Sequence, residues 1–171
     1  MNARTGLSAA GVVLLAVVAG TADGLTAQAP ASATVLTVAN DGKTVTIAAV
    51  DLKALPRARA EIKDEGRTVV YEGVLVADVL KRVDAPLGAA MRGDALGTVV
   101  VATATDGYQV VFSLAELDPA LTGSEIIVAD SADGKPLVEK QGPFRVVVPR
   151  DVRPTRSVRM LDRLELTRIR K

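Results

Sequence analysis

Cysteine and histidine are both absent from the 171 residues of this chain, and so is tryptophan. Thiolates and imidazoles are the ligands on which most zinc, copper, haem and iron–sulfur sites depend. The sequence therefore predicts no soft-metal site built from its own side chains. It also excludes internal disulfide bonds and every catalytic pair or triad that requires a cysteine or a histidine.

Aromatic side chains make up only 2% of the chain, and its formal net charge is +1. Proteins that bind single-stranded nucleic acid use aromatic stacking platforms, and a nearly neutral chain has no general attraction to phosphate backbones. The sequence therefore predicts no nucleic-acid partner. A hydrophobic content of 49% with 24% charged residues instead indicates a globular protein whose core consists of valine, leucine, isoleucine and alanine.

The first 33 residues have the organisation of a secretory signal peptide. Arg4 precedes an apolar run over residues 11–19, and small residues follow as far as Ala33. The apolar run is too short to span a bilayer comfortably. We therefore expect an exported protein that is periplasmic or secreted.

The end of this signal peptide can be placed in more than one way. Ala31-Ser32-Ala33 has the small-x-small form of a cleavage site and predicts a mature chain that begins near Thr34. Cleavage near Ala27 or Ala29 and an uncleaved N-terminal anchor are the alternatives. Residues 34–171 are then expected to form a single domain, because their number suits one hydrophobic core.

Three hairpins are predicted by pairs of β-rich segments on either side of short polar turns. The turns contain Asp41-Gly42, Glu65-Gly66 and Asp106-Gly107, in which glycine supplies the left-handed backbone of a tight turn. The paired segments are residues 34–39 with 44–47, 57–63 with 67–72, and 98–102 with 108–112. This pattern is typical of antiparallel sheets.

Helical signals are short and few. Residues 50–55 suggest one or two helical turns, and Leu75 to Val83 have apolar side chains at helical spacing. Ser113 and Glu116 have the spacing of a capping box, which predicts a short helix that starts at Ser113.

Further strands are expected at residues 126–129, 144–149 and 163–169, with a turn over residues 130–136. The turn contains Asp130 and Asp133 but lacks the ligand spacing of an EF-hand loop, so it predicts no calcium site. The whole pattern indicates a mainly β, α+β domain with eight or nine strands in hairpins and two or three short helices.

The charge is concentrated at the C-terminal end. From Arg145 to Lys171 there are nine basic residues and three acidic ones. Forked guanidinium donors can bind an anion, so Arg145, Arg150, Arg153 and Arg156 are candidate contacts to an anionic ligand. The alternative is a solvated last strand with alternating charges. Tyr108 is a further candidate, because its hydroxyl could face a ligand in a pocket. The alternative is that the Tyr108 side chain only covers the sheet.

A series of motifs along the chain resembles the molybdopterin-binding domain of the sulfite oxidase family. They are Asp51-Leu52-Lys53-Ala54-Leu55-Pro56, Tyr71-Glu72-Gly73-Val74-Leu75-Val76-Ala77-Asp78-Val79-Leu80, Thr105-Asp106-Gly107-Tyr108, Phe112-Ser113-Leu114, Ala129-Asp130 through Gly134-Lys135-Pro136-Leu137, and Gly142-Pro143-Phe144-Arg145-Val146-Val147-Val148-Pro149. The resemblance implies a mixed α+β fold. It also implies a molybdenum ion held by a pterin dithiolene and one cysteine, at which an oxygen atom or electrons are transferred.

This chain departs from the family pattern at the metal, since it has neither the cysteine ligand nor the histidines that contact the pterin. We therefore expect no cofactor, although the resemblance makes molybdopterin the one to consider, and we expect a binding or interaction module. Its partner would be an anionic small molecule or an exported or membrane protein. The alternative is a molybdopterin-dependent oxidoreductase with a non-cysteine ligand or no protein ligand, so whether the chain is an enzyme stays open.

Overall fold

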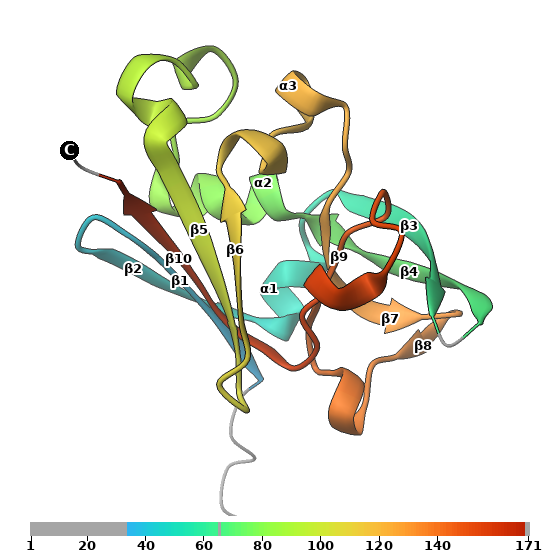
Figure 1. The fold of residues 1–171 in the computed structure, drawn as a ribbon. Coiled ribbons are helices and arrows are strands. Elements are labelled where there is room, and N and C mark those ends of the chain that lie inside the picture. The colour runs from blue at the N-terminus through green and yellow to red at the C-terminus, as the bar shows by residue number, and fades with distance from the viewer. Residues whose placement is uncertain (1–33, 65, 170–171) are drawn as a thin grey trace, which may run out of the picture. The chain divides into compact units, whose positions relative to one another are not determined.

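The computed structural model describes residues 34–64 and 66–169 (Figure 1). The predicted signal peptide, residues 1–33, lies outside the described residues. Within them, no helix is long and apolar enough to cross a membrane.

The first of two five-stranded sheets, sheet A, combines strands from the beginning, middle and end of the described chain. Its order is β2-β1-β10-β5-β6, and the β1–β10 pair is parallel whereas the other pairs are antiparallel. The strands are β1 (Val35–Asn40), β2 (Lys43–Ala48), β5 (Thr98–Ala104), β6 (Gln109–Ser113) and β10 (Leu161–Arg168). The C-terminal strand therefore occupies the centre of sheet A, and β6 occupies one edge.

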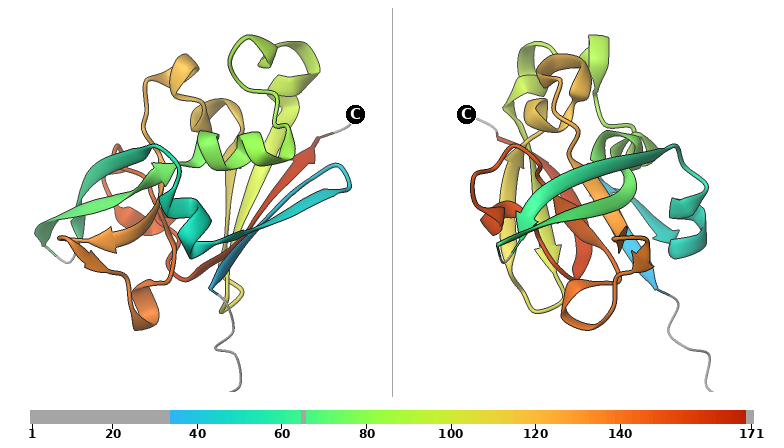
Figure 2. Two further views of the ribbon diagram at one scale, coloured as in Figure 1. Left: turned by 180° about the vertical axis from the view of Figure 1, so that it is seen from behind. Right: turned by 90° about the vertical axis from the view of Figure 1, so that its right-hand side faces the viewer.

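The second sheet, sheet B, has the order β3-β4-β7-β8, and β9 pairs with β7. Its strands are β3 (Arg57–Asp64), β4 (Arg67–Leu75), β7 (Ile127–Ala132), β8 (Lys135–Pro136) and β9 (Arg145–Val147). Figure 2 shows the two sheets as separate layers, with α1 and α2 where they meet.

The helices are short and connect the strands. The α-helices are α1 (Ala49–Lys53), α2 (Val76–Leu80) and α3 (Pro119–Thr122). The 3-10 turns are η1 (Lys81–Val83), η2 (Gly88–Ala90), η3 (Gly93–Gly97), η4 (Ala115–Leu117), η5 (Glu139–Gln141) and η6 (Pro154–Arg156). The predicted mainly β, α+β class is confirmed, with ten strands and three α-helices among the described residues.

The core is aliphatic, as the composition predicts. One large cluster combines the inner face of sheet A with α2 and one face of sheet B, and it contains both phenylalanines, Phe112 and Phe144. A smaller cluster covers the other face of sheet B and includes Tyr71 and Ile127. Each sheet thus contributes alternate side chains to a buried layer, which explains why the strands are rich in β-branched residues.

Most local predictions agree with the structure, and two need correction. The three predicted hairpins and the final strand are present. The first correction concerns the capping box at Ser113, which leads into a single 3-10 turn instead of an α-helix. Residues 130–136 are not simply a turn, since β7 continues to Ala132 and only Asp133-Gly134 turn before β8. Buried Asp130 accepts two hydrogen bonds from Arg57, at 2.7 and 2.8 Å, so its place in a strand is stabilised by charge pairing.

Candidate functional site

Most candidate residues lie in the segment between β9 and β10, residues 149–160, which we call the arginine loop. It contains Arg150, Arg153, Arg156 and Arg159 and a single acidic residue, Asp151. The loop lies beside the β5–β6 hairpin, because the Tyr108 hydroxyl donates a hydrogen bond to the Thr155 carbonyl oxygen at 2.8 Å (Figure 2). Sheet A therefore positions one side of the loop.

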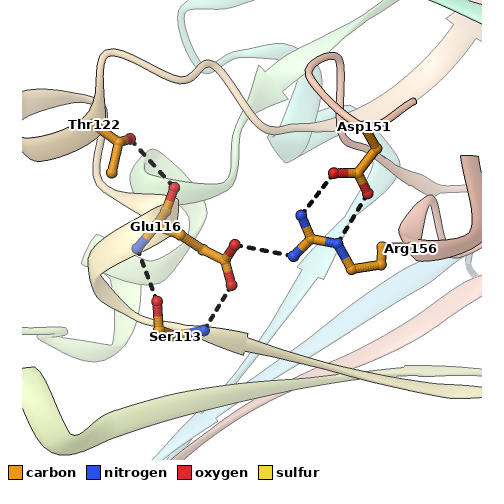
Figure 3. Close-up of polar contacts among 5 residues, drawn as sticks. All are labelled: Ser113, Glu116, Thr122, Asp151 and Arg156. Carbon is orange, nitrogen blue, oxygen red and sulfur yellow. Dashed lines mark hydrogen bonds and ion pairs between the residues drawn. The ribbon is translucent and has the colours of Figure 1, made fainter. Parts of the chain in front are cut away.

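Arg156 is the centre of an ion-pair network that anchors the loop (Figure 3). Its Nε and one terminal nitrogen donate to the two carboxylate oxygens of Asp151, at 2.9 and 2.7 Å. Its other terminal nitrogen donates to Glu116 Oε2 at 2.9 Å. Glu116 Oε1 accepts from the Ser113 backbone N–H at 2.8 Å, and Ser113 Oγ accepts from the Glu116 N–H at 3.2 Å. The predicted capping box is thus also the anchor of the arginine loop.

The charge of Arg156 is balanced within the molecule. Hydrogen bonds to Asp151 and then to Glu116 raise the pKa of the guanidinium above its ordinary value, and partial burial opposes this rise without cancelling it. The guanidinium carbon also lies 5.4 Å from the ring centre of Phe112, within cation–π range. A guanidinium with two carboxylate partners has little remaining capacity for an external anion.

Arg150 is exposed, but its guanidinium has internal acceptors. It donates to the carbonyl oxygens of Thr122 and Gly123, at 3.3 and 2.9 Å. These carbonyls belong to the C-terminal end of α3, where a cation offsets unpaired carbonyl groups. Arg150 therefore joins the arginine loop to α3.

Arg145 lies apart from the other candidates. Its side chain is 0% exposed in sheet B, where one terminal nitrogen donates to the Tyr71 hydroxyl at 2.5 Å and to Gln141 Oε1 at 2.8 Å. The guanidinium carbon is 4.8 Å from the ring centre of Tyr71. A ligand at the surface of the arginine loop does not reach this buried group, so the structure places Arg145 in the scaffold.

Arg153 and Tyr108 remain accessible. Arg153 is exposed, and no hydrogen bond or ion pair from it to another described residue is present. Tyr108 is 49% exposed, and its backbone N–H donates to Asp106 Oδ1 at 3.0 Å. Its hydroxyl faces the arginine loop through Thr155, so it does not merely cover the outer face of the sheet.

A cavity of about 620 Å³ adjoins Tyr108, between the β5–β6 turn, η5 and the arginine loop. Asp106, Lys140, Thr155, Arg159 and Met160 contribute to its lining. Two cations, one carboxylate and an aromatic ring therefore surround one space. Sequence reasoning did not select Lys140 or Arg159, because Lys140 reaches the cavity from η5 and Arg159 is only one member of the basic run.

Metal ligands do not converge in the part of the chain that the structure describes. Within residues 34–64 and 66–169, no group of three or more aspartate, glutamate, histidine or cysteine residues could hold a metal ion. The carboxylates beside Arg156, those of Asp151 and Glu116, are paired with it, and Asp106 accepts a hydrogen bond from the Tyr108 backbone N–H. The arrangement is suited to binding an anion beside Tyr108.

The family described as the oxidoreductase molybdopterin-binding domain matches residues 58–171 of this chain. No curated protein matches the chain. The matched range contains the arginine loop, Tyr108 and the cavity beside it.

Among solved structures, the sulfane dehydrogenase SoxCD from Paracoccus pantotrophus is similar to this chain. The TM-score is 0.58 at 17% sequence identity, over 78% of this chain and 38% of that one. The chain thus spans well under half the length of that protein. At this identity the likeness concerns the fold alone.

Proposed function

Because this chain belongs to the oxidoreductase molybdopterin-binding domain family, we propose that it is a member whose fold serves as an exported binding or interaction module, without a protein ligand to molybdenum. One observation above all supports the proposal, namely that none of its 171 residues is a cysteine or a histidine. A fold supplies an activity only where its site residues support the chemistry.

The side chains present do not fit a molybdenum–pterin group as the family resemblance describes it. That resemblance implies a cysteine thiolate on the metal, with histidines and arginines around the pterin. Here Arg145 is buried, and Arg150 and Arg156 already have internal acceptors. Within the described residues, no group of three or more aspartate, glutamate, histidine or cysteine residues could hold a metal ion by itself. This donor set supports no reaction step at molybdenum.

The cavity beside Tyr108 is the ligand site that we propose. Lys140 and Arg159 give it positive charge, and the phenol ring offers a flat apolar surface. A carboxylate or phosphate on a small aromatic or aliphatic body matches this combination, since charge-assisted hydrogen bonds are the strong ones in such a site. Arg153, exposed on the same loop, adds a further cation at the surface.

A protein partner is the second candidate, and one residue favours it. Val152, between Arg150 and Arg153 in sequence, is 99% exposed. An apolar side chain flanked by arginines suits an acidic, partly apolar surface on another exported or membrane protein. The export of the chain, to the periplasm or beyond, is part of the proposal and is supported by the signal-peptide pattern in residues 1–33.

The ligand site is tested by calorimetric titration with phenyl phosphate, and with phenol as the neutral control. We expect phenyl phosphate to bind wild type, and Lys140→Ala to weaken that binding by about tenfold, the loss typical of one charge-assisted hydrogen bond. Lys63→Ala is the matched control, because Lys63 is an exposed lysine on β3 outside the cavity. Equal affinity in the two lysine variants would contradict this ligand site.

A further inference from the structure

The edges of the two sheets are not equally protected against pairing with another strand. Natural proteins block exposed edges with charged residues, proline or very short strands. The edge strand β3 carries exposed Arg57, Arg59, Glu61 and Lys63, and β8 consists only of Lys135 and Pro136. In contrast, β6 (Gln109–Ser113) contains neither a charged residue nor a proline, and among the described edge strands it alone has this composition.

The register of β5 and β6 shows which backbone groups of β6 point away from the sheet. Ala104 N–H donates to the Tyr108 carbonyl, and Leu114 N–H donates to the Thr98 carbonyl, both at 2.9 Å. Hydrogen-bonded pairs alternate along an antiparallel ladder, so Val110 and Phe112 also bond to β5. The N–H and C=O groups of Gln109, Val111 and Ser113 therefore point outward.

Only one of these outward groups is already used. The Ser113 N–H donates to Glu116 Oε1, which closes the end of the edge. No backbone hydrogen bond from Gln109 or Val111 to a residue beyond the β5–β6 pair is present among the described residues. The open length of the edge is therefore centred on Val111.

Two side-chain environments flank this open edge. On the outer face, Val111 is 58% exposed and lies directly opposite Val101, so the surface there is apolar. On the other face, the arginine loop is attached near both ends of β6, through Tyr108 and through the Arg156–Glu116 pair. That loop has four arginines and one aspartate, so it keeps a net positive charge even though Arg156 is paired with Asp151 and Glu116.

We propose that the β6 edge binds an extended segment of a partner protein, which adds to sheet A as a sixth strand. Its apolar side chains lie beside Val111, and its acidic side chains face the arginine loop. Backbone hydrogen bonds supply the affinity in this mode, and the alternating side chains supply the specificity. The inference rests on the proposed binding role and names the class of partner.

The test uses labelled seven-residue peptides and fluorescence anisotropy with the full chain. A peptide of alternating glutamate and valine should bind, and its lysine–valine counterpart should not, because the arginine loop repels it. Successive N–H groups of a strand point to opposite sides. Edge pairing therefore predicts that N-methylation abolishes binding either at the valines or at the glutamates, but not at both.

Val111→Pro is the variant that addresses the edge. Because the Val111 N–H points away from β5, proline removes an outward donor and leaves the β5–β6 ladder complete. We expect the glutamate–valine peptide to bind Val111→Pro at least about tenfold more weakly than wild type. This is the effect of losing one well-placed hydrogen bond between β6 and the peptide strand. Thr46→Pro is the matched control, since Thr46 is exposed on the other edge strand of sheet A, β2, and its N–H also points outward.

Several outcomes would overturn the proposal. Binding that survives Val111→Pro and both methylation patterns, but is lost in Arg153→Ala, would show that charge alone holds the peptide and would leave the binding role intact. A wild-type dimer that Val111→Pro dissociates would show that the edge pairs with a second copy of this chain. No binding of the glutamate–valine peptide to wild type would also contradict it. If Val111→Pro fails to fold, the methylated peptides still decide on wild type.

Discussion

Arg156 contributes to three parts of the structure. It pairs with Asp151 inside the arginine loop, with Glu116 at the end of β6, and with the ring of the buried Phe112. These contacts join the loop to sheet A but use most of the donors of the guanidinium. An arginine that the sequence marks as a candidate anion contact therefore uses most of its donors in contacts within the molecule.

Glu116 should matter more for its cap than for its charge. Glu116→Ala removes both the acceptor for the Ser113 N–H and the Arg156 pair, and we expect it to lower the free energy of unfolding by about 1–2 kcal/mol. Glu116→Gln keeps an acceptor for the Ser113 N–H and loses only a partly exposed ion pair, so about 0.5 kcal/mol is expected. Urea denaturation measures both values. Equal losses would show that the cap contributes nothing beyond the ion pair.

The candidate side chains could be selected from sequence, but their environments could not. Arg145 follows Phe144 and precedes a three-valine run, a pattern compatible with either face of a strand. Its burial against Tyr71 depends on a contact between β9 and β4. Lys140 reaches the cavity only because η5 folds toward the β5–β6 turn. Contacts of this kind join residues far apart in sequence, so no local pattern reports them.

At the level of elements, the hairpins were predictable because each depends on local chemistry. Asp-Gly turns, alternating β-branched residues and the Ser113–Glu116 cap all act within a few residues. Sheet order was not predictable in this way. The parallel pairing of β1 with β10 joins the two ends of the described chain, and it places the final strand at the centre of sheet A.

Gly73 is the position where two strands of sheet B most restrict the sequence. A Cβ there would lie 2.0 Å from the Val128 carbonyl oxygen, next to the irregular register of β4 and β7. We expect Gly73→Ala to cost about 3 kcal/mol or more in the free energy of unfolding, because backbone cannot yield as a side chain does. Gly97→Ala meets only an ordinary 3.7 Å contact and should change stability by less than about 0.5 kcal/mol. Similar thermal midpoints for the two variants would contradict this close approach.

At the scale of the whole molecule, the residues that stabilise the fold differ from those on which the family's metal chemistry depends. Packing of aliphatic side chains between two sheets requires no cysteine or histidine, so the family fold persists without them. The metal chemistry that the resemblance implies depends on a few specific ligands, which the packing of the scaffold does not require. The arginine loop, the cavity beside Tyr108 and the β6 edge are the surfaces to which we assign the proposed binding role.

The most direct test of this account is molybdenum analysis by mass spectrometry, with pterin fluorescence after oxidation, on protein exported and purified from a host that makes the cofactor. The account predicts molybdenum and pterin far below one equivalent per chain, because the chain has no thiolate or imidazole to hold them. Molybdenum and pterin near one equivalent would contradict it, and would favour a molybdopterin-dependent oxidoreductase whose metal has an oxygen ligand or no protein ligand.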